Sequence, residues 1–194
     1  MKAAIFLITP WISACASLST APDITDCENI SNTEEKTIFI LSADKICDTK
    51  LSLTPDGHYV FSVESISDDW ADGDRHDALR RPSLSESGWT ASQLPWYLRG
   101  VIIAQPFRRC SDGRWFEIIG EVLDSSDTSI KYRLGEGMSN KKVLHYKGTA
   151  NNRLILYAND LNSRYHNNFG KMTISVQQVR NNAMKNRPQV LVCK

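Results

Sequence analysis

The chain has 194 residues, of which 41% are hydrophobic and 23% are charged, so it can bury the core of one globular domain. Its formal net charge of +1 gives no electrostatic reason to expect nucleic acid as a partner. Arginines recur locally at Arg80, Arg81, Arg99, Arg108, Arg109 and Arg114. They could form a basic patch, but we expect scattered, solvated side chains.

Residues 1–14 have a short basic start and an apolar segment that is too short to span a bilayer, which is typical of an export signal. The segment ends in Ile12-Ser13-Ala14-Cys15, which resembles the lipobox of bacterial lipoproteins. The resemblance implies a signal peptide over 1–14 and lipidation of Cys15. Ala16 is not the aspartate that retains such proteins at the inner membrane, so we expect a lipid-anchored outer-membrane protein on its periplasmic or surface face. The alternative is a soluble secreted protein that is cleaved nearby.

Residues 15–36 are rich in Ser, Thr, Asp, Glu and Asn and carry little apolar periodicity. A segment of this composition has little apolar surface to bury, so we interpret it as a lipidated, flexible tether. The remaining residues, 37–194, are then expected to form a single domain.

Apart from Cys15, the chain contains Cys27, Cys47, Cys110 and Cys193. An even number of cysteines in an exported chain indicates two disulfides, with three possible pairings. We favour Cys27 with Cys47, which closes a short N-terminal segment, and Cys110 with Cys193, which ties the middle of the chain to its end. The spacing does not fit a zinc site.

From residue 37 onward, short β-rich segments alternate with turn sequences such as Pro55-Asp56-Gly57 and Ser111-Asp112-Gly113. The expected strands are 37–41, 50–53, 59–63, 101–107, 115–119, 130–134, 143–146, 154–157 and 172–179. No long amphipathic helix is apparent. This pattern predicts an all-β fold, an antiparallel β-sandwich of the jelly-roll kind.

Residues 68–95 interrupt this pattern with a long polar stretch that includes Trp70 and Trp89. A long insertion in a compact sandwich is often a binding loop. The alternative is that the tryptophans fill the end of the core.

A second loop follows the expected strand at 154–157 and contains Asn159, Asp160, Asn167, Asn168 and Gly170. Carboxylate and amide oxygens are the ligands that calcium prefers, so one loop of this composition could wrap a cation. The same residue types also form ordinary turns, because they tolerate left-handed backbone and bond to their own main chain. Composition alone leaves both interpretations open.

Three segments carry a resemblance to a known family. They are Cys47-Asp48-Thr49-Lys50-Leu51 with Leu53, Gly57, Tyr59, Trp70 and Asp72; residues 113–120; and Leu156-Tyr157 through Gly170, followed by Ile174 and Val176. Together they resemble the calcium-dependent galactophilic lectins of bacteria and the related galactose-binding-like jelly-roll domains. The resemblance covers most of residues 47–179, and in the third segment the spacing agrees without a gap.

The resemblance implies one calcium ion bound by the side chains of Asp160, Asn167 and Asn168, by the Arg164 carbonyl, and by a carbonyl of Asp72 or Gly73. One carboxylate among neutral oxygens leaves the site positively charged, with open coordination positions that two sugar hydroxyls could fill. Asp160 and Asn167 would therefore also meet the ligand.

Sugar contacts outside the metal loop are less complete. His76 is the one counterpart of the histidine with which the lectins hold a sugar, and their glutamine has no counterpart here. Trp70 could stack on the apolar face of a sugar ring. The alternatives are a solvated His76 and a Trp70 in the core.

Two function classes follow. The first is an outer-membrane lipoprotein with a lectin-like, calcium-assisted carbohydrate-binding domain. The second is an envelope lipoprotein that binds another protein, such as an immunity, exclusion or secretion-system accessory factor, through the same sandwich. We do not expect an enzyme, because no nucleophile, base or paired-carboxylate arrangement stands out.

Overall fold

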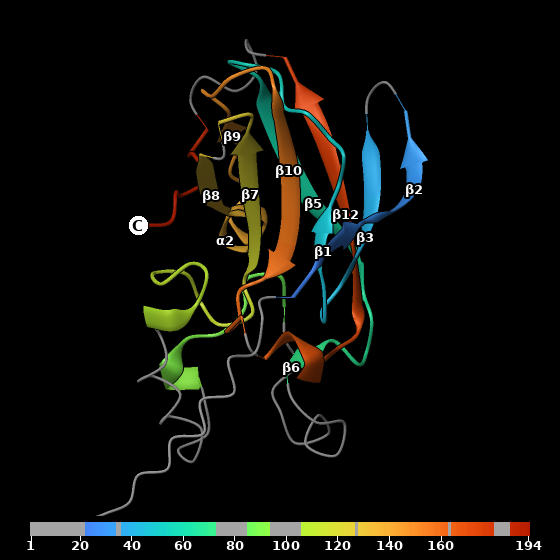
Figure 1. Ribbon diagram of the computed structural model, residues 1–194, viewed down its shortest axis with the longest axis vertical. Helices are drawn as coiled ribbons and strands as arrows, with labels where there is room; N and C mark the ends of the chain where they lie inside the picture. The colour runs from blue at the N-terminus through green and yellow to red at the C-terminus, as the bar shows by residue number, and fades with distance from the viewer. Residues whose placement is uncertain are drawn as a thin grey trace, which may run out of the picture.

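The computed structural model describes residues 22–33, 36–72, 85–93, 106–126, 128–162, 164–180 and 187–194. Two five-stranded sheets lie face to face (Figure 1). The first sheet has the order β1 (Ile24–Asp26), β4 (Ile46–Asp48), β10 (Asn152–Ala158), β7 (Ile118–Asp124) and β8 (Ser129–Arg133). The second has the order β2 (Glu28–Asn32), β3 (Thr37–Ser42), β12 (Lys171–Val179), β5 (His58–Ile66) and β9 (Leu144–His145). The expected all-β sandwich is confirmed.

Most neighbouring strands are antiparallel, and the chain repeatedly crosses from one sheet to the other, as from β3 to β4 and from β10 to β12. The β1–β4 pair is parallel. Smaller elements are the two-stranded sheet of β6 (Ala71–Asp72) and β11 (Asn168–Phe169), the 3₁₀ helices η1 (Ala91–Gln93) and η3 (Tyr165–Asn167), and the short helix α2 (Leu134–Ser139).

The main core lies between the sheets and is built by alternation along each strand. In β3, Phe39 and Leu41 are buried, whereas their neighbours are partly exposed. β10 contributes Leu154 and Leu156 to the same cluster, and β12 contributes Ile174 with its buried neighbours. Each such side chain stabilises the fold by about 1.5–3 kcal/mol relative to an exposed one.

A second, smaller cluster covers the outer face of the first sheet. Ile155 and Tyr157 of β10 point away from the main core and pack with Ile119, Tyr165 and Cys110. Two loops, around residue 110 and around residue 165, are therefore fixed against the outside of β10 and β7. This packing positions the loop at residues 159–170, in which the sequence predicts a calcium site.

The structure corrects the predicted tether at residues 15–36. β1 and β2 fall inside it, and each adds an edge strand to one of the two sheets. Most of their side chains are exposed, so neither strand carries the apolar alternation by which a sequence reveals a buried strand. The folded domain thus begins by Ile24 rather than at Thr37.

Most other expected strands are present, and the exceptions have local causes. The expected strand at 50–53 does not form, because Lys50 adopts a left-handed backbone conformation with φ of 57°. The expected strand at 115–119 is reduced to the start of β7, and Phe116 has φ of 59°. Residues 101–105 and, within the stretch 68–95, residues 73–84, 94 and 95 lie outside the described residues.

Both expected disulfides are confirmed, Cys27 with Cys47 and Cys110 with Cys193. The second joins the loop around residue 110 to the C-terminal segment. In the part of the chain that the structure describes, we find no helix of the length and apolar character needed to cross a membrane.

Candidate functional site

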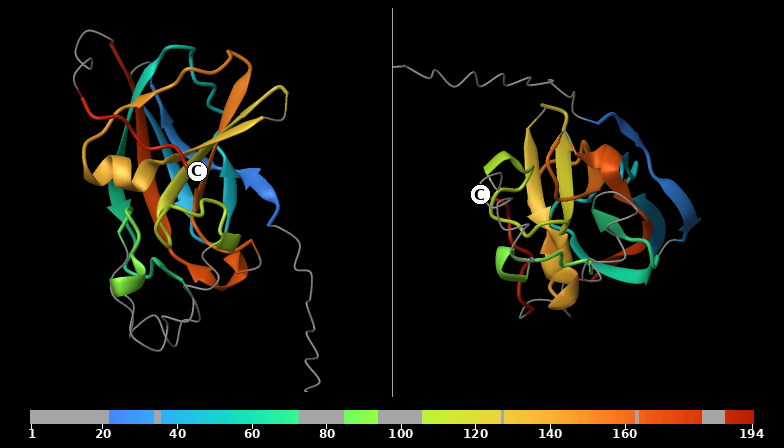
Figure 2. Two further views of the ribbon diagram at one scale, coloured as in Figure 1. Left: turned by 90° about the vertical axis from the view of Figure 1, so that its left-hand side faces the viewer. Right: turned by 90° about the horizontal axis from the view of Figure 1, so that it is seen from below.

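The loop from Asn159 to Gly170 connects β10 to β12 and lies beside β6 at the lower end of the sandwich in Figure 1. The right-hand view of Figure 2 looks at the molecule from this end. Asn159 and Asp160 are the first two residues after β10, and η3 and β11 bring the chain back to the second sheet.

Asn159 is a structural residue of this loop. Its side chain is fully buried, and its Oδ1 accepts a hydrogen bond of 3.0 Å from the backbone N–H of Cys110. Its Nδ2 donates to the carbonyls of Cys110 and Arg114, both at 2.9 Å. The Asn159 backbone exchanges two further bonds with Phe116 and Glu117. Because its amide bonds on both sides, Asn159 ties the loop around residue 110 to the end of β10.

Arg108 lies on the other side of Asp160. Its backbone forms an isolated antiparallel bridge with Leu161, and its guanidinium lies 4.7 Å from the centre of the Trp115 ring. The residue is 5% exposed. Burial lowers the pKa of Arg108 to about 10, opposed by the negative charges of Glu117 and Asp160, so the side chain is positive at neutral pH.

The prediction of solvated arginines is therefore wrong for Arg108 and also for Arg109. The Arg109 guanidinium lies over the Tyr157 ring at 4.8 Å and pairs with the buried Glu121 at 3.4 Å. Both arginines anchor the residue-110 loop to the sheet, a role that follows from partners distant in sequence.

Asp160 and Asn168 are buried and in direct contact. Asp160 is 1% exposed, and its Oδ1 accepts a hydrogen bond of 2.7 Å from the backbone N–H of Leu161. Its Oδ2 accepts one of 3.1 Å from the Nδ2 of Asn168, which is 3% exposed. The same Nδ2 donates to the Ala43 carbonyl at 3.2 Å.

These contacts fix the orientation of the Asn168 amide. Both neighbours of the Nδ2 atom, the Ala43 carbonyl and the Asp160 carboxylate, are acceptors, so the NH₂ group must face them. The Oδ1 atom of Asn168 is left buried without a hydrogen-bond partner among the described residues, and so is the Oδ1 atom of Asn167. A buried polar atom without a partner costs about 1–3 kcal/mol. Two such oxygens therefore lie on consecutive residues of this loop.

Two of the residues whose carbonyls the resemblance implies as ligands, Arg164 and Asp72, contact this loop through their backbone. The Arg164 carbonyl accepts a hydrogen bond of 3.1 Å from the Asn167 N–H, which leaves its second lone pair for another partner. Asp72 in β6 pairs with Asn168 in β11, so its backbone adjoins the loop. Gly73 and His76 lie outside the described residues.

Two residues hold the loop in shape. The Tyr165 side chain is fully buried, and its hydroxyl donates a 2.5 Å hydrogen bond to the Ala158 carbonyl. Burial raises the pKa of Tyr165 well above its ordinary value. Gly170 has φ of 90°, and a Cβ atom there would lie 2.5 Å from the backbone of Trp70, so only glycine fits.

The structure corrects the role predicted for Trp70 as a ligand contact. Trp70 is 4% exposed, belongs to the main core, and meets the Phe116 ring edge to face at 5.4 Å. Its rings are therefore not available to stack on a sugar. Of the other predicted sugar contacts, Asp160 and Asn167 lie in the loop after β10, and His76 lies outside the described residues.

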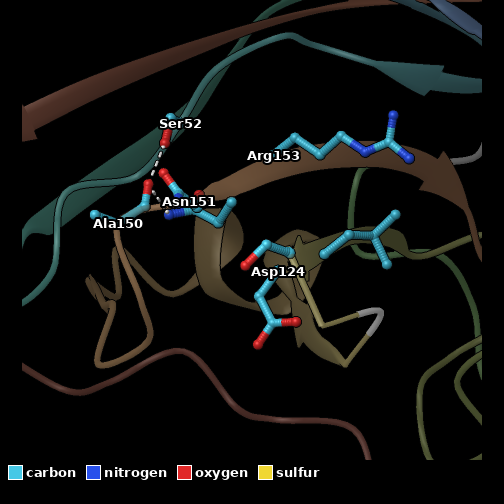
Figure 3. Close-up of a pocket in the computed structure, with 8 residues that line it drawn as sticks. Ser52, Asp124, Ala150, Asn151 and Arg153 are labelled. Atoms are coloured by element: carbon cyan, nitrogen blue, oxygen red, sulfur yellow. Dashed lines mark hydrogen bonds between the residues drawn. The ribbon is translucent and has the colours of Figure 1, made fainter.

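The opposite end of the sandwich supplies an internal comparison. A depression with a volume of about 350 Å³ lies there. Figure 3 shows Ser52, Asp124, Ala150, Asn151 and Arg153 around it. Asp124 Oδ1 accepts three hydrogen bonds from Ser126 and Thr128 within its own turn. The Asp124 Oδ1 atom is thus satisfied by its own turn.

Asn152, at the start of β10, is satisfied in the same way. Its Oδ1 accepts from the Leu53 N–H at 2.8 Å, and its Nδ2 donates to the carbonyls of Leu53 and Thr149, both at 2.7 Å. This end has Asn and Asp in turns, as the first end does, but these two side chains have no unpaired buried oxygen.

One further group of potential metal ligands occurs among the described residues. Cys110, Asp112 and Cys193 lie close enough to share an ion. The two cysteines form a disulfide, so their sulfur atoms are not available as thiolate ligands.

Comparison of the chain with protein-family models, with curated proteins and with solved structures finds no match. The functional argument therefore rests on the residues themselves.

Proposed function

We propose that this protein is an outer-membrane lipoprotein with a lectin-like domain that binds carbohydrate with the help of one calcium ion. The observation that carries the proposal is the pair of buried Oδ1 atoms of Asn167 and Asn168, which have no hydrogen-bond partner among the described residues, in the loop where the Asn168 Nδ2 contacts the buried carboxylate of Asp160. Lipidation of Cys15 and the outer-membrane location rest on the lipobox resemblance.

The donor set suits calcium. Calcium takes six to eight oxygen ligands, from carboxylates, amide oxygens, backbone carbonyls and water. Asp160, Asn167 and Asn168 would supply side-chain oxygens, and Arg164 and either Asp72 or Gly73 would supply carbonyls. All these donors are hard oxygen atoms, whereas transition metals such as zinc prefer nitrogen and sulfur.

The charge of the site favours an oxygen-rich ligand. Asp160 is the one carboxylate of the proposed set, so a bound calcium ion keeps a net positive charge. The buried positive charge of Arg108 lies close enough to Asp160 for their charges to interact. Calcium positions that the protein does not fill would be taken by water, and two neighbouring hydroxyls of a sugar can replace two waters. The calcium ion would then supply the main polar contact to the glycan.

Binding of the mature chain to a glycan array, with millimolar calcium or with a chelator, tests the proposal. We expect at least one glycan signal that calcium supports and chelation removes. Calcium binding without any glycan signal would reject the carbohydrate part. A protein from the native envelope that binds at 1:1 stoichiometry, despite chelation and free sugar, would favour the alternative of a protein-binding lipoprotein.

A further inference from the structure

We propose that the Cys110–Cys193 disulfide controls calcium affinity, because it holds the segment that positions Asp160. Reduction of this disulfide would then weaken the site. The inference rests on the proposed calcium site and adds a regulation to it.

The segment 108–114 contacts the residues on both sides of Asp160. On one side, the main chain of Cys110 exchanges two hydrogen bonds, of 3.0 and 2.9 Å, with the side chain of Asn159. On the other side, Arg108 bridges to Leu161. The direction of the Asp160 carboxylate is thus set by neighbours that are both attached to this segment.

The C-terminal residues hold the segment in turn. Cys193 is bonded to Cys110, and its N–H donates a 2.9 Å hydrogen bond to the Lys131 carbonyl in β8. Lys194 adds weaker polar contacts, including one of 3.1 Å from its N–H to the Asp112 carboxylate. The disulfide is the covalent link in this path from β8 to Asp160.

The bond is open to a reductant from one side. Cys110 is 1% exposed, whereas Cys193 is partly exposed and lies between the exposed residues Val192 and Lys194. A dithiol thiolate would attack the Cys193 sulfur, and the Cys110 thiolate would leave and take up a proton. The second thiol of the reagent would then displace Cys193 and close the reagent's own disulfide, so that two electrons pass to the protein.

Loss of the link would loosen the segment and widen the range of positions of the Asp160 carboxylate. Groups that orient a metal ligand without touching the metal typically change its affinity about 10- to 100-fold. We therefore expect Asn159 and the disulfide to act as positioning groups, while the metal contacts remain those of the loop itself.

The chain offers a matched control. The Cys27–Cys47 disulfide ties the N-terminal edge strand to β4, and the Cys27 N–H bonds to the Asp48 carbonyl. Removal of this disulfide is expected to lower the stability of the fold without reaching the Asp160 carboxylate.

The test is calcium titration calorimetry on the full chain and on the double variants Cys110→Ser/Cys193→Ser and Cys27→Ser/Cys47→Ser, with circular dichroism to confirm folding. We expect the dissociation constant to rise at least about tenfold in the first variant and less than about twofold in the second. Dithiothreitol should raise the constant of the Cys27→Ser/Cys47→Ser variant to that of the first.

Asn159→Ala removes the side-chain hydrogen bonds to Cys110 while both disulfides stay intact. It replaces the Cys110→Ser/Cys193→Ser variant if that variant does not fold, and we expect a similar rise in the calcium dissociation constant. Equal calcium affinity in the parent chain and in Asn159→Ala or the folded Cys110→Ser/Cys193→Ser variant would overturn the inference and leave the calcium site standing. Absence of calcium binding in the parent chain would overturn both.

Discussion

The two ends of the sandwich use the same residue types for different purposes. At one end, Asp124 and Asn152 bond their own turns and the neighbouring main chain. At the other, Asn167 and Asn168 keep buried oxygens without a hydrogen-bond partner among the described residues. The strand β10 joins the two ends, with Asn152 at its start and Asp160 two residues after its last residue.

This difference separates a turn from a candidate binding site. A turn needs its Asn and Asp oxygens for its own N–H groups, so those oxygens are paired. A metal loop must leave oxygens unpaired and must accept the cost when the metal is absent. The hydrogen bonds therefore favour a binding site at the second end, a choice that composition left open and that calcium titration tests.

Replacement of a carboxylate at each end should give the largest difference in calcium affinity between the two ends. Asp160→Asn keeps the size of the side chain but removes the one negative charge of the proposed metal set, so we expect calcium affinity to fall at least about 100-fold. Titration calorimetry measures this directly.

Asp124→Asn is the matched change at the other end, and calcium affinity should stay within about twofold. A similar loss in both variants would mean that the two ends do not differ as we describe.

Removal of an amide side chain at each end should change the free energy of unfolding by different amounts. Without calcium, Asn152→Ala should lower the free energy of unfolding by about 2–3 kcal/mol, because it leaves the Leu53 N–H and two carbonyls without partners. Asn167→Ala should cost less than about 1 kcal/mol, since it removes an oxygen that is itself unpaired. Denaturant unfolding in a chelating buffer gives both values.

In the presence of calcium, the difference in stability between these two variants should change. The calcium-dependent gain in stability, which follows RT ln(1 + [Ca²⁺]/Kd), should persist in Asn152→Ala and shrink in Asn167→Ala. A full calcium effect in Asn167→Ala would exclude this residue from the metal set.

The smallest expected effect is the contribution of Asp124 to the pH dependence of stability. The hydrogen bond from the Ser126 hydroxyl, followed by those from the backbone N–H groups of Ser126 and Thr128, lowers the pKa of Asp124. Because the pKa is lower in the folded state, this carboxylate contributes stability above its unfolded pKa of about 3.9, and the contribution is lost as pH falls through the folded value.

Carboxyl carbon shifts in an NMR titration should report the lowered pKa of Asp124 and should be the same with and without calcium. A calcium-dependent pKa there would indicate that the satisfied end also binds the ion.

Much of the sandwich could be predicted from the sequence, because its inner strands alternate apolar and polar residues. β12 and β5 are examples, and each was expected over most of its length. The edge strands β1 and β2 were missed, since exposed edge strands need no such alternation. The expected strand at 50–53 is absent because Lys50 has a positive φ, and lysine is not a residue type from which a positive φ would be predicted.

The candidate site shows a similar division. Asp160, Asn167 and Asn168 could be selected because they lie in one loop, so their spacing is visible in the sequence. The Ala43 carbonyl that orients Asn168 comes from 125 residues away and acts through its backbone, so no residue type marks it. The sequence predicted a solvated Arg108. Its burial depends on the Trp115 ring and on the charge of Asp160, which become its neighbours only in the folded protein.

The central claim is that the loop from Asp160 to Asn168 binds calcium. Titration calorimetry of the chelator-treated full chain with calcium chloride tests it most directly. The account predicts saturable binding of one calcium ion per chain that is lost in Asp160→Asn. Absence of saturable binding up to millimolar calcium, or unchanged binding in Asp160→Asn, would contradict it.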